Sequence, residues 1–217
     1  VDGDGDLDLF AGNIGLNAQY VASPEKPIQV NFGDLDGNGS FDAVVSQYYG
    51  ETLAPIYSKD EMDAQMRYFM NTHYKFYEDY STTTTAQIMT KFKGEVAELK
   101  ANCMASMYFE NRDGKWVAHS LPPAAQFSPV FDFVHDQEHD AILAVGNSYD
   151  NKVELGWVDG LNGLFLTKST SGELMHSYGT GFYVPEVAKG VIPIMIGAEK
   201  HYLVAVNHGK LKLFKAL

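Results

Sequence analysis

Residues 34–42, which read DLDGNGSFD, constrain the fold of this chain more than any other segment. Oxygen-bearing side chains stand at alternate positions, and calcium takes about six to eight oxygen ligands from a flexible ring of this kind. Gly37 and Gly39 allow the tight backbone path that the ring needs. The expected ligands are four side chains and the Ser40 carbonyl oxygen: Asp34, Asp36, Asn38, Ser40 and Asp42. The segment predicts a calcium loop between two β-strands, with Phe41 directed into the core.

Residues 1–8 repeat this loop without its first ligand position. Three side chains and one carbonyl oxygen, that of Asp6, are the expected ligands: Asp2, Asp4, Asp6 and Asp8. Because one ligand is missing, this copy predicts a weakened calcium site. The chain starts inside the motif, which indicates a piece of a longer protein.

Residues 132–140 keep the length of the loop but change its ligands. Val134 replaces the second ligand, and His135 and Gln137 replace the two glycines. A transition-metal site that uses His135 and His139 is the alternative, but no nearby cysteine or helical histidine pair would complete it. We interpret this copy as a turn that has lost its calcium.

Short apolar strands follow each of the three loops, and several further strands are separated by turn signals such as Asn162-Gly163 and His208-Gly209. Recurrence of a loop-then-strand unit favours a β-propeller, or part of one, over a β-sandwich. The expected fold is therefore mainly β, as a single propeller-like domain or fragment over residues 1–217.

A helical insertion is expected at about residues 58–102. Ser58 and Glu61 have the spacing of a capping box. Eight residues behind it fall on one helical stripe that would pack on the domain: Met62, Met66, Phe69, Met70, His73, Phe76, Tyr77 and Tyr80. A second, shorter helix with Ile88, Met89 and Phe92 is expected after residues 82–85.

Charge and composition exclude several classes of partner. The formal net charge is −12, so the surface repels phosphate backbones and anionic lipids, and we expect no nucleic-acid partner. No apolar run is long enough for a membrane span. Cys103 is the only cysteine, which excludes an intrachain disulfide and a multi-cysteine zinc site.

The pattern DxDGNGxxD followed by an apolar strand, with Asn31-Phe32-Gly33 directly before it, resembles the FG-GAP/VCBS repeat family. Leu99–Asn102 and Phe182–Pro185 also resemble the C-terminal part of secreted VCBS-repeat proteins of the Bacteroidetes type. This resemblance implies a β-propeller with blades like those of the integrin α-chain, calcium on the loops, and a secreted or cell-surface location.

Two functions are compatible with these features. The first is a non-catalytic, extracytoplasmic domain with structural calcium that presents loops to a protein or a glycan. The alternative is an accessory part of a polysaccharide-acting enzyme, with Tyr48, Tyr49, Tyr57 and Trp157 stacking on sugar rings. No nucleophile motif is present to support catalysis. Open sheet edges would favour self-association.

Overall fold

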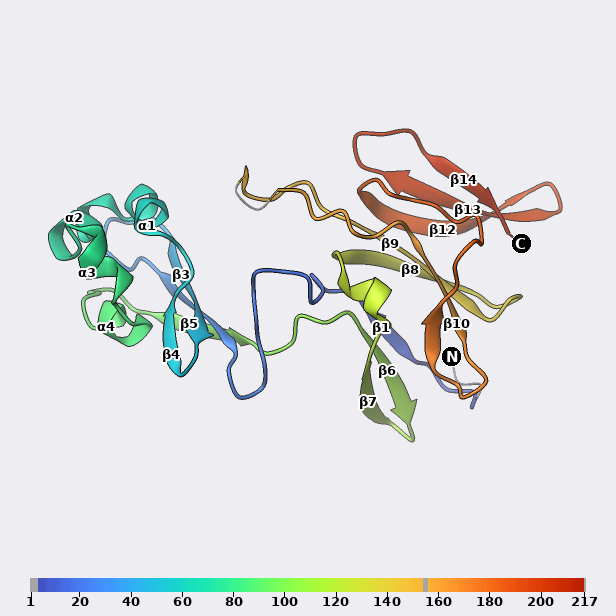
Figure 1. Ribbon diagram of the computed structural model, residues 1–217, viewed down its shortest axis with the longest axis horizontal. Helices are drawn as coiled ribbons and strands as arrows, with labels where there is room; N and C mark the ends of the chain where they lie inside the picture. Colours follow the sequence, from blue (N-terminus) through green and yellow to red (C-terminus); the bar gives the residue numbers. More distant parts are fainter. Residues whose placement is uncertain (1–3, 154–155, 217) are drawn as a thin grey trace. The chain divides into compact units, whose positions relative to one another are not determined.

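The computed structural model describes residues 4–153 and 156–216 and is mainly β, as the sequence predicted. The described strands form four antiparallel sheets (Figure 1), and none of these four sheets closes on itself. The chain divides into two compact units. Unit 1 comprises Val1–Ala18 and Ala105–Leu217, and unit 2 comprises Gln19–Met104, so unit 2 interrupts unit 1 in the sequence.

Unit 2 contains a four-stranded sheet in the order β4-β3-β2-β5. Its strands are β2 (Ile28–Gly33), β3 (Asp42–Tyr49), β4 (Thr52–Pro55) and β5 (Ala97–Ala101). β3 is central, and its residues Asp42, Val44 and Ser46 are buried on one face. This is the period of two that a strand with one face on the core requires.

Four helices lie in the chain between β4 and β5, so the helical insertion is shorter than the predicted residues 58–102, of which 97–101 form β5. They are α1 (Lys59–Gln65), α2 (Arg67–His73), α3 (Tyr77–Ser81) and α4 (Thr85–Met89). The predicted capping box starts α1: the Ser58 N–H donates to Glu61 Oε2 at 2.8 Å, and the Glu61 N–H donates to Ser58 Oγ at 3.3 Å.

The predicted stripe does not lie on one continuous helix. Met66 and Tyr74 leave the helical region, with φ −130° and −137°, and separate α1, α2 and α3. Phe76 and Tyr77 are consequently exposed, whereas the earlier stripe residues Met62, Met66 and Met70 are fully buried. The sequence pattern predicted the apolar residues of this face but not the two interruptions of the helix at Met66 and Tyr74.

The core of unit 2 joins the helices to the sheet. Its buried side chains come from the loop after β2, from β3 and from the helical segment: Leu35, Val44, Met62, Met66, Phe69, Met70, Tyr74, Tyr80 and Ile88. α4 is tied to β3 by a buried hydrogen bond from Thr85 Oγ1 to Ser46 Oγ at 2.8 Å.

Unit 1 contains three sheets. The first has the order β1-β6-β7, with β1 (Leu9–Ala11) paired to β6 (Met107–Arg112) and β6 to β7 (Lys115–Ser120). A 3-10 helix, η1 (Pro123–Gln126), follows β7. Asp113 (φ 53°) and Gly114 (φ 80°) close the β6–β7 hairpin.

The second sheet of unit 1 is a simple meander in the order β11-β10-β9-β8. Its strands are β8 (Val130–Asp136), β9 (Ala141–Gly146), β10 (Leu164–Lys168) and β11 (Leu174–His176). β9 is buried along its whole length because both of its faces are covered.

The third sheet has the order β12-β13-β14, with β12 (Ala188–Ile196), β13 (Glu199–Val206) and β14 (Lys212–Lys215). Side chains of β9, β12 and β13 share one hydrophobic cluster, which includes Leu143, Val191 and Tyr202. In the part of the chain that the structure describes, no helix is long and apolar enough to cross a membrane.

Candidate metal site

The predicted calcium loop connects β2 to β3, and the β2–β3 ladder closes it where Gly33 pairs with Asp42. Three side-chain oxygens accept hydrogen bonds from backbone N–H groups of the loop. Asp34 Oδ2 accepts from Gly39 (3.0 Å), Asp36 Oδ1 from Asn38 (3.1 Å) and Asn38 Oδ1 from Ser40 (2.7 Å). These bonds wrap the backbone around the side-chain oxygens, as a cation loop requires.

Three carboxylates of the loop lie close together. One oxygen each from Asp34, Asp36 and Asp42 lies within 4.8 Å of the other two. Asn38 and Ser40, the other two expected ligands, are exposed residues of the same loop. The structure therefore gathers the acidic part of the predicted ligand set.

Asp42 is the buried member of this group, with 1% of its surface exposed. Its Oδ2 accepts a hydrogen bond from the Leu35 N–H at 3.1 Å, whereas its Oδ1 is buried and has no hydrogen-bond partner. Burial, and then the negative charges of Asp36 and Asp34, raise the pKa of Asp42. A divalent cation would satisfy the buried oxygen and offset the repulsion, so the residues fit calcium.

The surrounding elements hold the loop from two sides. Gln65 of α1 makes two hydrogen bonds to the backbone of Ala43, next to Asp42: its Nε2 donates to the carbonyl (2.9 Å) and its Oε1 accepts from the N–H (3.0 Å). Gly94 approaches the Asp34 carbonyl so closely that a Cβ there would lie 2.1 Å from the oxygen. The sequence pattern predicts neither the hydrogen bonds of Gln65 nor the close approach of Gly94.

The prediction for Phe41 is wrong. Phe41 is 72% exposed and lies against Phe32, with the ring centroids 5.7 Å apart. Leu35 is instead the loop residue that enters the core, and it is fully buried. The reason is that β3 starts with Asp42 facing inward, so the residue before it faces outward.

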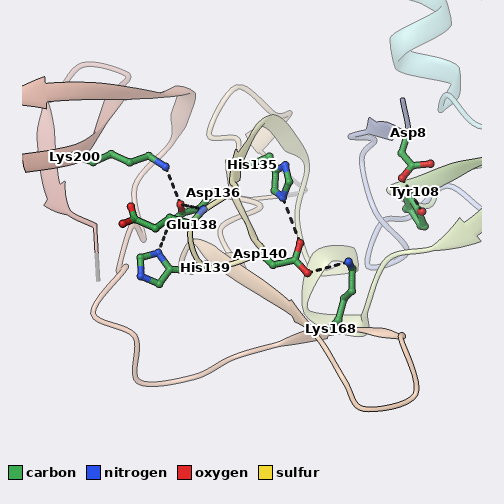
Figure 2. A network of polar contacts seen from close by, with 9 residues as sticks. All are labelled: Asp8, Tyr108, His135, Asp136, Glu138, His139, Asp140, Lys168 and Lys200. Carbon is green, nitrogen blue, oxygen red and sulfur yellow. Dashed lines mark hydrogen bonds and ion pairs between the residues drawn. The ribbon is translucent and has the colours of Figure 1, made fainter. Parts of the chain in front are cut away.

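The first loop is held differently. Asp8 Oδ1 accepts from the Asn111 N–H at 3.0 Å, and Asp8 Oδ2 accepts from the Tyr108 hydroxyl at 3.2 Å (Figure 2). Both partners belong to β6. Within the described residues, Asp4, Asp6 and Asp8 do not form a group like that of the intact loop, and Asp2 lies outside these residues. Calcium at this loop stays a prediction.

In the third copy of the loop motif, residues 132–140, two lysines form ion pairs with aspartate carboxylates. Asp136, 1% exposed, accepts from Lys200 Nζ at 2.8 Å and lies 2.8 Å from His139 Nδ1 (Figure 2). Burial alone would raise the pKa of Asp136, but the hydrogen bonds from Lys200 and His139 outweigh it and lower the pKa. Lys168 Nζ lies 3.0 Å from Asp140 Oδ2.

In these contacts, lysine side chains of the protein supply the positive charge that offsets the two carboxylates. Lys200 comes from β13, so the pair joins the second sheet of unit 1 to the third. Asp136, Glu138 and His139 do lie within 4.8 Å of one another, but the Asp136 carboxylate is already paired. The prediction that this copy keeps the full length of the loop is wrong, because residues 132–136 belong to β8 and only residues 137–140 form the turn to β9.

The aromatic residues considered for sugar stacking belong to both units: Tyr48, Tyr49 and Tyr57 to unit 2, and Trp157 to unit 1. Tyr57 packs against the core of unit 2, and Tyr49 is exposed at the end of β3. Trp157 belongs to unit 1, is exposed, and stacks on Tyr149 with the ring centroids 4.6 Å apart.

Comparison of the chain with protein-family models, with curated proteins and with solved structures finds no match.

Proposed function

We propose that this chain is a non-catalytic, extracytoplasmic repeat region of the FG-GAP/VCBS type with a propeller-like arrangement of sheets. In this proposal, a structural calcium ion stiffens the 34–42 loop, and other loops are presented for recognition of a protein or a glycan. The observation that carries the calcium part is the group of Asp34, Asp36 and Asp42 carboxylates within 4.8 Å of one another, in which the buried Asp42 has an oxygen without a hydrogen-bond partner.

The physical role of calcium follows from the neighbours of Asp42 in the chain. Asp42 is the first residue of β3, and Leu35, whose N–H it binds, lies in the core with the helices. A cation that binds the three carboxylates would therefore hold the loop, the sheet and the core in one arrangement. A ligand that binds only the folded state stabilises it by about 2.7 kcal/mol at a concentration a hundredfold above its Kd.

Sites of this kind suit a location outside the cytosol, where calcium is abundant. Extracellular modules bind calcium with dissociation constants of about 10⁻⁴ to 10⁻³ M. The net charge of −12 also disfavours binding to nucleic acid or to anionic membrane surfaces. These points support a secreted or cell-surface setting.

Calorimetric unfolding with calcium and with EDTA tests the proposal. We expect calcium to raise the melting temperature by roughly 4–8 °C per kcal/mol of stabilisation for the smaller unit. Asp36→Asn keeps the size of the side chain and removes one charged ligand, so it should abolish most of this shift. Magnesium is expected to give a smaller shift because it demands a more rigid octahedral site.

Glu25→Gln is the matched control. It removes one negative charge from an exposed position in the same unit, outside the loop, and should keep the full calcium response. If the unaltered protein has the same melting temperature in calcium and in EDTA, the proposed structural calcium ion is contradicted.

A further inference from the structure

A second feature, separate from the calcium loop, is a pocket in unit 1 with a volume of about 380 Å³. Three segments line it: Ala124 and Phe127 at η1, residues 160–164 up to the start of β10, and residues 176–183 from the end of β11 onward. Its volume lies within the range of about 300–1,000 Å³ that is typical of small-ligand sites.

The walls of this pocket are fixed by hydrogen bonds. The Val184 N–H donates to the Asn162 carbonyl and the Ser177 N–H to the Phe165 carbonyl, each at 2.8 Å. The buried side chain of Asn147 binds Leu161 twice, donating to its carbonyl (2.6 Å) and accepting from its N–H (3.0 Å). Long connecting segments are thereby held in place, so the pocket exists before any ligand binds.

The lining is uncharged and aromatic. Of the described residues that line the pocket, none is Asp, Glu, Lys or Arg, although the chain has a net charge of −12. Its ring-bearing side chains are Phe127, His176, Tyr178, Phe182 and Tyr183. An uncharged lining in so acidic a protein excludes ionic recognition as the basis of binding and favours an uncharged ligand.

Tyr178 forms a flat platform at this pocket. Its ring lies parallel to that of His176, with an interplanar angle of 15° and a centroid separation of 4.3 Å. Tyr178 is nevertheless 83% exposed, so the ring face away from His176 is open. Tyr183 is a second exposed ring, and both phenols can donate or accept hydrogen bonds.

Polar groups accompany the rings without adding charge. The exposed Asn162 offers both an amide donor and a carbonyl acceptor. Burial lowers the pKa of His176, which keeps its imidazole neutral at pH 7. The matching ligand has apolar faces for the rings and hydroxyl groups at its edges, which is the chemistry of a pyranose sugar.

We propose that this aromatic pocket binds a neutral saccharide, with Tyr178 and Tyr183 stacking on pyranose rings and the Asn162 amide binding hydroxyl groups. The inference rests on the recognition role proposed above and names its ligand class. It does not involve the calcium loop, which belongs to unit 2.

This site is tested by isothermal titration calorimetry with four neutral saccharides: cellohexaose, laminarihexaose, xylohexaose and mannohexaose. Oligogalacturonate, a charged saccharide, is titrated separately for comparison. We expect at least one neutral hexasaccharide to bind and oligogalacturonate to bind more weakly. Tyr178→Ala should weaken binding by about tenfold, because an exposed stacking ring is removed. Tyr178→Phe keeps the ring and should stay within about threefold of the unaltered protein, since only one hydroxyl is lost.

Tyr68→Ala is the matched control, since Tyr68 is 82% exposed but lies on α2 in the other unit. It should bind the saccharide like the unaltered protein. The inference is overturned if no neutral hexasaccharide binds at millimolar concentration, if oligogalacturonate binds instead, or if Tyr178→Ala binds normally. A calcium shift measured on the same samples shows whether the proposed structural role stands independently of that result.

Discussion

At the scale of single residues, the two buried aspartates Asp42 and Asp136 have opposite electrostatic environments. Asp42 lies beside Asp34 and Asp36, which together with burial raise its pKa. Asp136 lies beside Lys200 and His139, which lower its pKa. Asp136 is therefore paired with a cation from the chain, whereas the charges that act on Asp42 are negative.

The lowered pKa of Asp136 predicts a pH dependence of stability. A depressed folded-state pKa stabilises the protein above the unfolded value of 3.8, and this stability is lost as the pH falls through the folded-state pKa. Asp136→Asn cannot titrate, so it should cost roughly 2 kcal/mol of unfolding free energy at pH 7 and progressively less below about pH 4.

Urea unfolding followed by tryptophan fluorescence between pH 2 and pH 7 measures this difference, because both tryptophans lie in the same unit as Asp136. Asp113→Asn, an exposed turn position, is the control and should change the stability little at any pH. A difference between the unaltered protein and Asp136→Asn that stays constant over this range would contradict the assignment.

At the scale of elements, the loop depends on a helix that the calcium motif does not include. Gln65, the last residue of α1, satisfies both backbone groups of Ala43 at a point where β4 does not pair with β3. This arrangement protects the start of an otherwise open strand edge.

Removal of the Gln65 amide is therefore expected to weaken unit 2. Gln65→Met has a similar volume but leaves a half-buried N–H and C=O without partners, which should cost about 1–3 kcal/mol. Urea unfolding followed by circular dichroism at 222 nm measures the effect. Gln19→Met, an exposed position in the same unit, should have a negligible effect, and equal stabilities of the two variants would refute the role of Gln65.

Local patterns in the sequence predicted the local features well. The strands after each loop, the capping box at Ser58 and the apolar face with Met62 and Met70 all depend on neighbours within a few residues. Contacts between distant segments could not be predicted. Lys200 is 64 residues from Asp136, and the walls of the aromatic pocket come from three separate segments, so no periodicity marks either of them.

At the scale of the whole molecule, the two units carry different spectroscopic reporters. Both tryptophans, Trp116 and Trp157, belong to unit 1, whereas the four α-helices of the described residues belong to unit 2. Thermal unfolding can therefore be followed separately for each unit.

Calcium should act on only one of these two signals. Because the intact loop lies in unit 2, calcium is expected to raise the midpoint of the ellipticity transition at 222 nm by several degrees. The midpoint of the tryptophan fluorescence transition should move by less than about 1 °C, since a ligand stabilises only the cooperative unit that binds it. A shift confined to tryptophan fluorescence would place the calcium in unit 1 instead.

The interruption of unit 1 by unit 2 also has a consequence for synthesis on the ribosome. Leu9 of β1 pairs with Phe109 of β6, and the nascent chain must grow by the whole of unit 2 before this partner emerges. At about 5–20 residues per second, β1 stays unpaired for on the order of ten seconds. Unit 2 has all of its residues within one continuous stretch and can mature during that delay, so translation order itself would separate the folding of the two units in time.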